Sequence, residues 1–243
     1  MSIHLKFLIC LIGCGWFVSC AGSGVRFSTG RDAWGHRPGP KGFHSVIIDA
    51  GHGGKDAGAT SRWTGQREKD LTLDLAQRLK AELRGQFNCR LMRGGDTFVD
   101  LDERVTRANR YGDAILVSLH FNSGISQARG PETYYWRVDS HGLATRVQAA
   151  MCAVSPAENA NRGLVRRRLR LTRNPEIPCV LLEGGYLSHP AESRLIADPR
   201  YRQNLARAIA GAIRTQAASG DAGTGTLPPP IYAPRSRSSD KRE

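Results

Sequence analysis

Three short runs of mostly apolar residues, each leading into a side chain of a metal-binding type, constrain this 243-residue chain more than any other feature. Residues 46–50 lead into a Gly-rich turn that holds His52, residues 114–119 lead into His120, and residues 179–182 lead into Glu183. Runs of this length and composition are typical of strands buried on both faces, as in parallel sheets. The sequence therefore predicts an open sheet that carries two histidines and a glutamate at one edge.

Helical and strand patterns alternate between these runs. Leu71, Leu75, Leu79 and Leu83 recur every four residues, which places them on one face of a helix. We expect strands at 44–50, 89–93, 114–120, 132–138, 168–172 and 179–183, and helices at 69–85, 101–111, 142–152, 192–197 and 201–216. This alternation predicts an α/β three-layer sandwich, with a mostly parallel twisted sheet of about six strands and helices on both faces.

The two ends of the chain differ in composition from its middle. Lys6 precedes an apolar stretch that is too short to span a bilayer and stands where a secretory signal would. The small residues around Cys20 resemble a lipoprotein cleavage box, so we predict lipid attachment at Cys20, with Cys14 or plain cleavage near Ala21 as alternatives. The predicted organisation is a signal peptide at 1–20, a flexible tether at 21–42, one folded domain at 43–219 and a disordered tail at 220–243.

The chain is strongly basic, with a formal net charge of +13 and a pI near 10.0. Such a charge favours polyanionic partners: nucleic acid, anionic lipid or an acidic wall polymer. Export would exclude nucleic acid and leave the cell envelope, with a membrane contact through the N-terminal lipid. Beyond the targeting segment the cysteines are Cys89, Cys152 and Cys179. Without a Cys-x-x-Cys pair they do not predict a thiolate zinc site, and a disulfide among them stays open.

The residues that end the strands suit a hydrolytic metal site. Catalytic zinc uses three protein ligands and an open position, and it lowers the pKa of bound water. His52 and His120 supply imidazoles, while Glu68 and Glu183 are the candidate carboxylates. Glu68 can instead be a helix-dipole residue, and Glu183 can instead pair with an arginine. Spacing alone leaves both alternatives open.

Several motifs together resemble one family, the zinc-dependent N-acetylmuramoyl-L-alanine amidases of the type found in bacterial division and spore-lysis enzymes. The motifs are residues 48–59 (IDAGHGGKDAGA), Glu68 at a helix start, 101–109 leading to Asp113, 118–123 (SLHFNS), 130–135 (GPETYY) and 178–188 (PCVLLEGGYLS). The resemblance spans nearly all of residues 46–213, and the order of the motifs makes it specific.

The resemblance implies a role for each candidate residue. His52, Glu68 and His120 would bind one Zn²⁺ ion, and Glu183 would be the catalytic carboxylate. The substrate would be peptidoglycan, cut between N-acetylmuramic acid and L-alanine of the stem peptide, in cell-wall turnover or cell separation by a monomer. Two alternatives are a zinc peptidase or carboxypeptidase acting within the stem peptide, and a non-catalytic peptidoglycan-binding lipoprotein.

Three further residues carry expectations about the pocket. Arg173 lies in a basic run from 162 to 173, which is either a solvated strand edge or a cleft wall that binds substrate carboxylates. Phe121 stands where the family often has a small residue, which predicts a bulkier pocket wall. Asp56 is expected to shape the Gly-rich loop.

Overall fold

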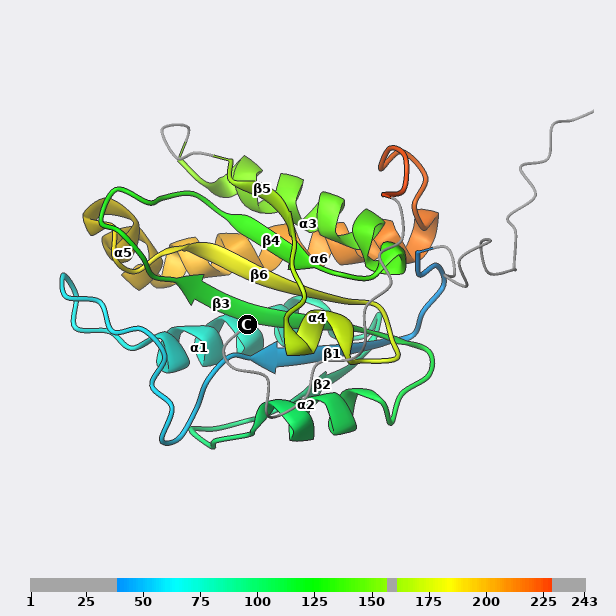
Figure 1. Ribbon diagram of the computed structural model, residues 1–243, viewed down its shortest axis with the longest axis horizontal. Coiled ribbons are helices and arrows are strands. Elements are labelled where there is room, and N and C mark those ends of the chain that lie inside the picture. Colours follow the sequence, from blue (N-terminus) through cyan, green and yellow to red (C-terminus); the bar gives the residue numbers. More distant parts are fainter. Residues whose placement is uncertain (1–38, 157–160, 229–243) are drawn as a thin grey trace, which may run out of the picture.

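The carboxyl ends of four parallel strands meet at one edge of the sheet and set the place of the candidate site (Figure 1). The computed structural model describes residues 39–156 and 161–228. The sheet order is β2-β1-β3-β6-β4-β5. Strands β2 (Asn88–Leu91), β1 (Ser45–Ala50), β3 (Ala114–Asn122) and β6 (Cys179–Tyr186) are parallel. Strand β4 (Glu132–Tyr135) is antiparallel to β6, and β5 (Gly163–Arg166) is parallel to β4.

Helices cover both faces of this sheet, which confirms the predicted three-layer architecture. Three long helices pack together on one face: α1 (Glu68–Glu82), α3 (His141–Val154) and α6 (Pro199–Ser219). The other face carries α2 (Leu101–Ala108) and the short α4 (Arg170–Arg173), which Figure 1 shows in front of the strands. Helix α5 (Pro190–Ala197) follows β6, and a 3-10 turn at Val138–Ser140 precedes α3.

Each face has its own hydrophobic core because the central strands are apolar on both sides. The larger core lies beneath α1, α3 and α6, and its fully buried members include Ile48, Leu79 and Leu182. The smaller core lies beneath α2 and α4 and includes Ile47 and Leu116. The alternation of Ile47 and Ile48 between the two cores follows from the two-residue period of a strand.

One predicted strand is wrong, and another is shorter than expected. Residues 168–172 do not form a strand: the basic run forms β5 at Gly163–Arg166 and then turns into α4. The Thr172 hydroxyl donates to the carbonyl oxygens of Arg167 and Leu169, which favours the helical turn. Strand β4 ends at Tyr135 rather than at 138.

The chain ends bear on the predicted organisation only in part. The predicted signal peptide, Cys20 and Cys14, tether residues 21–38 and tail residues 229–243 lie outside the described residues. Residues 220–228 of the predicted tail are described, and Asp221 accepts hydrogen bonds from the Gly39 amide (2.8 Å) and from Gln216 (3.0 Å). None of the helices within the described ranges is both long and apolar enough to cross a bilayer.

A buried ion pair joins the sheet to the loop that follows β1. Arg104 of α2 is 3% exposed and pairs with the fully buried Asp49 of β1. Its guanidinium also donates to the carbonyl oxygens of Ala50 (3.0 Å) and His52 (2.7 Å), while the Ser118 hydroxyl donates to Asp49 at 2.7 Å. Because Asp49 and Ser118 are buried, removal of the cation would leave a buried carboxylate without its counter-charge.

We therefore expect Arg104→Met to lower the free energy of unfolding by about 3–5 kcal/mol in urea titrations. The matched control is Arg207→Met on α6, whose side chain is 62% exposed and 4.0 Å from Glu82. That exposed pair should contribute less than about 1 kcal/mol. Equal losses in the two variants would contradict the role assigned to Arg104.

Candidate metal centre and active site

His52, Glu68 and His120 come together at the carboxyl edge of the sheet, and their potential ligand atoms all lie within 4.8 Å of one another. Glu68 Oε1 is 3.0 Å from His52 Nε2 and 2.9 Å from His120 Nδ1. His52 and His120 are 68 positions apart in the chain, yet the fold brings all three residues to this edge: His52 follows β1, Glu68 begins α1 and His120 lies near the end of β3. Two imidazoles and one carboxylate form a ligand set that suits a divalent transition metal, zinc above all.

Glycines around His52 make the approach of the three side chains possible. His52 itself has φ +62°, a conformation that few non-glycine residues adopt. A Cβ atom on Gly51 would stand 2.2 Å from Cε1 of His120, and one on Gly58 would stand 2.6 Å from Cδ2 of His52. The glycines of the predicted loop therefore leave the space that the ligand side chains fill.

Side chains outside the cluster fix the orientation of its members. Asp56 Oδ2 lies 2.8 Å from His52 Nδ1, so the Nε2 atom of His52 faces Glu68. Asp56 also accepts from the Gly58 amide at 3.0 Å, which confirms the expectation that it shapes the loop. A carboxylate behind a ligand histidine fixes its tautomer and raises its basicity.

A second buried arginine, Arg93, forms hydrogen bonds with the backbone of the same loop. Arg93 is 3% exposed. It donates to the carbonyl oxygens of Ala50 (3.0 Å), Gly51 (2.9 Å) and Lys69 (2.7 Å). Thr72 adds a hydrogen bond to the Gly51 carbonyl at 2.9 Å. The loop that carries His52 is thereby tied to the start of α1, where Glu68 lies.

Electrostatics keep Glu68 ionised. Burial opposes ionisation, but hydrogen bonds from His120 and His52 outweigh it and hold the pKa of Glu68 well below its usual range. The pKa of His52 shifts the other way. Burial lowers it, but the contacts with Glu68 and Asp56 raise it by more, so the pKa lies above its ordinary value. The Ala59 amide also donates to Glu68 at 2.9 Å.

Glu183 is a further acidic group at this edge, and no ion pair with it is found among the described residues. It lies opposite His120 on the parallel strand β3 and opposite Glu132 on β4. Burial, followed by the charges of Glu68 and Glu132, raises the pKa of Glu183 well above its ordinary value. Its Oε2 atom is buried and has no hydrogen-bond partner among the described residues.

Glu132, by contrast, has hydrogen-bond partners, and its role could not be predicted from the sequence. Its Oε1 atom accepts from the Tyr186 hydroxyl and from Asn122 Nδ2, each at 2.6 Å. Arg162 lies 3.6 Å away. The strand pattern of 132–138 pointed to its place in the sheet, but only the pairing of β4 with β6 brings it beside Glu183.

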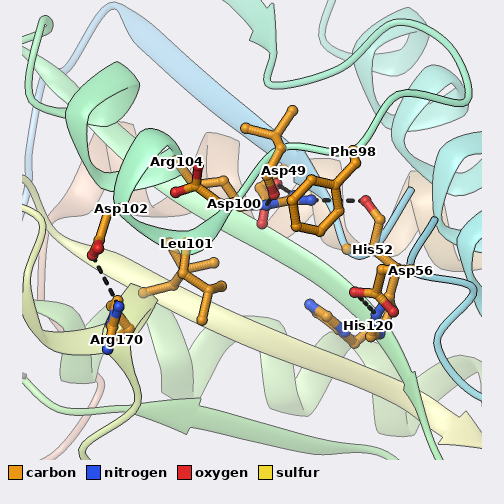
Figure 2. A pocket seen from close by; sticks show the side chains of 13 residues that line it. Asp49, His52, Asp56, Phe98, Asp100, Leu101, Asp102, Arg104, His120 and Arg170 are labelled. Atoms are coloured by element: carbon orange, nitrogen blue, oxygen red, sulfur yellow. Dashed lines mark hydrogen bonds and ion pairs between the residues drawn. The ribbon is translucent and has the colours of Figure 1, made fainter. Parts of the chain in front are cut away.

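A pocket of about 570 Å³ opens beside His52 and His120 on the α2 side of the sheet (Figure 2). Its rim includes the exposed Phe98 and Leu101, and Figure 2 shows Arg170 paired with Asp102 at its far end, 3.0 Å apart. The lining residues are Asp49, Gly51, His52, Asp56, Phe98, Val99, Asp100, Leu101, Asp102, Arg104, His120, Arg170 and Leu171.

Two residues that were predicted to form the pocket walls lie elsewhere in the structure. Arg173 is 6% exposed in α4 and does not line this pocket; Arg170, one turn earlier, does. Phe121 does not form a pocket wall: it is fully buried in the larger core, because it follows His120 in a strand and faces the opposite way. A Cβ atom on Gly184 would come within 2.9 Å of the Phe121 ring, which explains the glycine there. Cys89, Cys152 and Cys179, the cysteines of the described ranges, are free thiols.

The contact between Asp56 and His52 generates a test of the metal centre. We expect Asp56→Ala to lower the affinity for Zn²⁺ by about 10–100-fold in calorimetric titration, because His52 loses the group that orients it. The matched control is Asp70→Ala, which removes an exposed carboxylate that pairs with Arg67 at 2.7 Å. An equal loss of affinity in the two variants, or no loss in Asp56→Ala, would contradict the orienting role.

Comparison with known proteins places this geometry in a family. A family model described as N-acetylmuramoyl-L-alanine amidase matches residues 46–215. YqiI of Bacillus subtilis, an uncharacterized protein, is 33% identical over 174 residues, which cover 70% of this chain and 82% of YqiI. The probable cell wall amidase LytH of Staphylococcus aureus is also 33% identical over 174 residues, covering 70% of this chain but 57% of LytH.

Solved structures agree with these matches. An N-acetylmuramoyl-L-alanine amidase of Clostridium difficile 630 superposes with a TM-score of 0.68 at 31% identity, covering 72% of this chain and 97% of that one. The catalytic domain of the amidase CwlV of Bacillus (Paenibacillus) polymyxa gives 0.67 at 34% identity, covering 71% and 97%. The chain therefore belongs to the N-acetylmuramoyl-L-alanine amidase family, and the family model and the solved structures support that enzyme activity for it.

Proposed function

We propose that this chain is a zinc-dependent hydrolase that cleaves the amide bond between N-acetylmuramic acid and L-alanine in peptidoglycan. One observation carries the proposal: within the part of the chain that the structure describes, the buried Oε2 atom of Glu183 has no hydrogen-bond partner, and Glu183 lies beside the His52, Glu68 and His120 cluster. A buried carboxylate oxygen without a partner is costly unless it serves a bound group or a proton transfer.

The donor set fits a zinc ion held by His52, Glu68 and His120. When bound there, zinc supplies Lewis acidity: it polarises a carbonyl oxygen and makes a water easier to deprotonate. Asp56 behind His52, and the Ala59 amide on Glu68, are the supporting contacts that keep ligands oriented in such sites. The net charge of two neutral imidazoles and one carboxylate leaves the ion cationic, as hydrolysis requires.

Glu183 then carries the proton in both halves of the reaction. Its Oε2 takes a proton from the water whose oxygen attacks the lactyl carbonyl carbon. As the C–N bond breaks, the same oxygen gives that proton to the departing nitrogen of L-alanine. The products are a free lactyl carboxylate on the glycan and a stem peptide with a free amino terminus. A pKa raised by burial suits a group that must both accept and return a proton.

Two other functions use the same residues differently. A zinc peptidase acting within the stem peptide would release fragments cut between amino acids and no new L-alanine amino termini. A non-catalytic wall-binding protein would release nothing, and it would have no use for a buried Glu183 Oε2 atom that lacks a partner among the described residues. The family match favours the amidase over both.

The setting of the reaction is also part of the proposal. The LytH relatives are named probable cell wall amidases, which supports a place in the cell envelope for this chain. We propose export by the signal at 1–20 and anchoring by a lipid on Cys20, which lies outside the described residues, with a monomer acting in wall turnover or cell separation. Peptidoglycan, rather than nucleic acid, would be the partner of the basic surface.

The reaction is tested by digestion of purified sacculi with the full-length protein, with and without a chelator. We expect new L-alanine amino termini, identified by mass spectrometry, and at least about a hundredfold loss of rate in chelator that added Zn²⁺ restores. Fragments cut within the stem peptide would support the peptidase instead. Undiminished release in chelator would refute the metal dependence.

Glu183 is tested by Glu183→Gln, which keeps the size of the side chain and removes its basicity. We expect turnover to fall by at least about a thousandfold, the upper part of the range for acid–base groups, while Zn²⁺ affinity changes by less than about threefold. Glu176→Gln, at an exposed position before β6, is the matched control and should keep wild-type activity. Substantial turnover by Glu183→Gln would remove Glu183 from the mechanism.

The raised pKa of Glu183 also predicts a stability effect in the metal-free protein. A folded-state pKa above the unfolded value of 4.5 means that the stability contributed by the protonated group is lost as pH rises through the folded-state pKa. In chelator at neutral pH we therefore expect Glu183→Gln to have a Tm about 2–4 °C above wild type, with the gap closing toward pH 4. A gap that widens as pH falls would give the opposite sign and contradict the assigned burial effect.

A further inference from the structure

Two adjoining hollows form a groove beyond the carboxyl ends of β3 and β6, separate from the pocket at Phe98. We call it the arginine groove, after Arg62 and Arg129. The hollows measure about 510 and 300 Å³ and share Arg62 and Ser126. The lining residues are Thr60, Arg62, Trp63, Ser123, Gly124, Ser126, Gln127, Arg129, Ser188, His189 and Pro190. None of these lines the pocket beside Phe98.

The walls of the arginine groove are fixed in place. Trp63 is 41% exposed, but its indole N–H donates to the Ser188 carbonyl at 3.1 Å. The Ser188 hydroxyl accepts from the Gly124 amide at 3.0 Å, so one residue ties two of the walls together. The Arg62 guanidinium lies over the Trp63 ring, 4.5 Å from its centroid. A rigid groove binds with a smaller loss of conformational entropy than a mobile one.

The loops that build the arginine groove also carry or follow the residues of the metal centre. Thr60 to Trp63 lie between His52 and Glu68 in the chain, and the 123–129 segment follows His120 at the end of β3. Ser188 and His189 follow Glu183 at the end of β6. Figure 1 shows these loops together near α5, at the end of the sheet toward which β3 and β6 point.

The two hollowed regions differ in charge. The arginine groove is lined by two guanidiniums and by no carboxylate. The pocket beside Phe98 is lined by four carboxylates (Asp49, Asp56, Asp100 and Asp102) and two guanidiniums. Arginine recognises carboxylates through paired, charge-assisted hydrogen bonds. Complementary charge across a contact fixes the orientation of a ligand more than it adds affinity.

We propose that the arginine groove binds the stem peptide through its carboxylates, and that the uncharged glycan of the bound substrate extends from the metal centre along the pocket at Phe98. This assignment rests on the proposed function, because a muramoyl peptide has one anionic arm and one neutral arm on either side of the bond that breaks. Arg62 and Arg129 would be specificity-determining residues for the peptide arm. Phe98 is 40% exposed and offers an apolar face to a sugar ring. The Asp100 and Asp102 carboxylates beside it can accept hydrogen bonds from the hydroxyl groups of the sugar.

Steady-state kinetics on two soluble substrates test the assignment. One substrate is a muramoyl stem peptide with free carboxylates, and the other is the same molecule with every carboxylate converted to a carboxamide. For the zinc-loaded double variant Arg62→Gln/Arg129→Gln, we expect KM for the free acid to rise about tenfold or more with little change in kcat. KM for the carboxamide should change by less than about threefold, because it lacks the charges that the arginines bind.

The matched control is Arg84→Gln, an exposed arginine just beyond the end of α1 that is remote from Glu68. It should leave both KM values unchanged, which separates local recognition from a general loss of positive charge. Equal rises of KM on the two substrates, or no rise on the free acid, would overturn the assignment. Absence of cleavage by wild type on both substrates and on sacculi would instead refute the proposed function itself.

Discussion

Two buried guanidiniums hold the backbone on which the candidate site depends. Arg93 and Arg104 together donate to the carbonyl oxygens of Ala50, Gly51 and His52, the residues at which β1 becomes the metal-binding loop. A loop with so many glycines would otherwise have considerable conformational freedom. The arginines remove that freedom and satisfy buried carbonyls that have left the sheet. The strained backbone of His52 can persist because the hydrogen bonds from these two arginines fix the loop.

The acidic residues of the site lower the stability of the metal-free protein. Glu68, Glu132 and Glu183 place three carboxylates close together where β3, β4 and β6 meet. Histidines compensate Glu68, and Tyr186 and Asn122 compensate Glu132, but no hydrogen bond compensates Glu183 Oε2 within the described residues. Such an uncompensated group is typical of a functional site, where stability is given up for chemistry.

The fold was largely predictable because its signals are local. Apolar runs and the leucine stripe of α1 identified the central strands and the long helices, and the alternation of elements predicted the three layers. The error at 168–172 came from a basic run without clear periodicity, in which Thr172 bonds to nearby carbonyls and favours a helical turn. Phe121 was expected to form a pocket wall because the family often has a small residue at this position, whereas the strand period turns its side chain into the core.

The sequence by itself determined which side chains stand at strand ends, and the order of its motifs identified the family. It could not determine the partners of those side chains, because partners come from elements distant in the chain: Arg104 reaches Asp49 across 55 residues, and Glu132 reaches Glu183 only through the antiparallel pairing of β4 with β6. Burial, charge and orientation are properties of these long-range contacts. Tertiary structure alone therefore decided that the pKa of Glu68 is lowered by its histidine partners while burial raises the pKa of Glu183, although both are glutamates at the same edge.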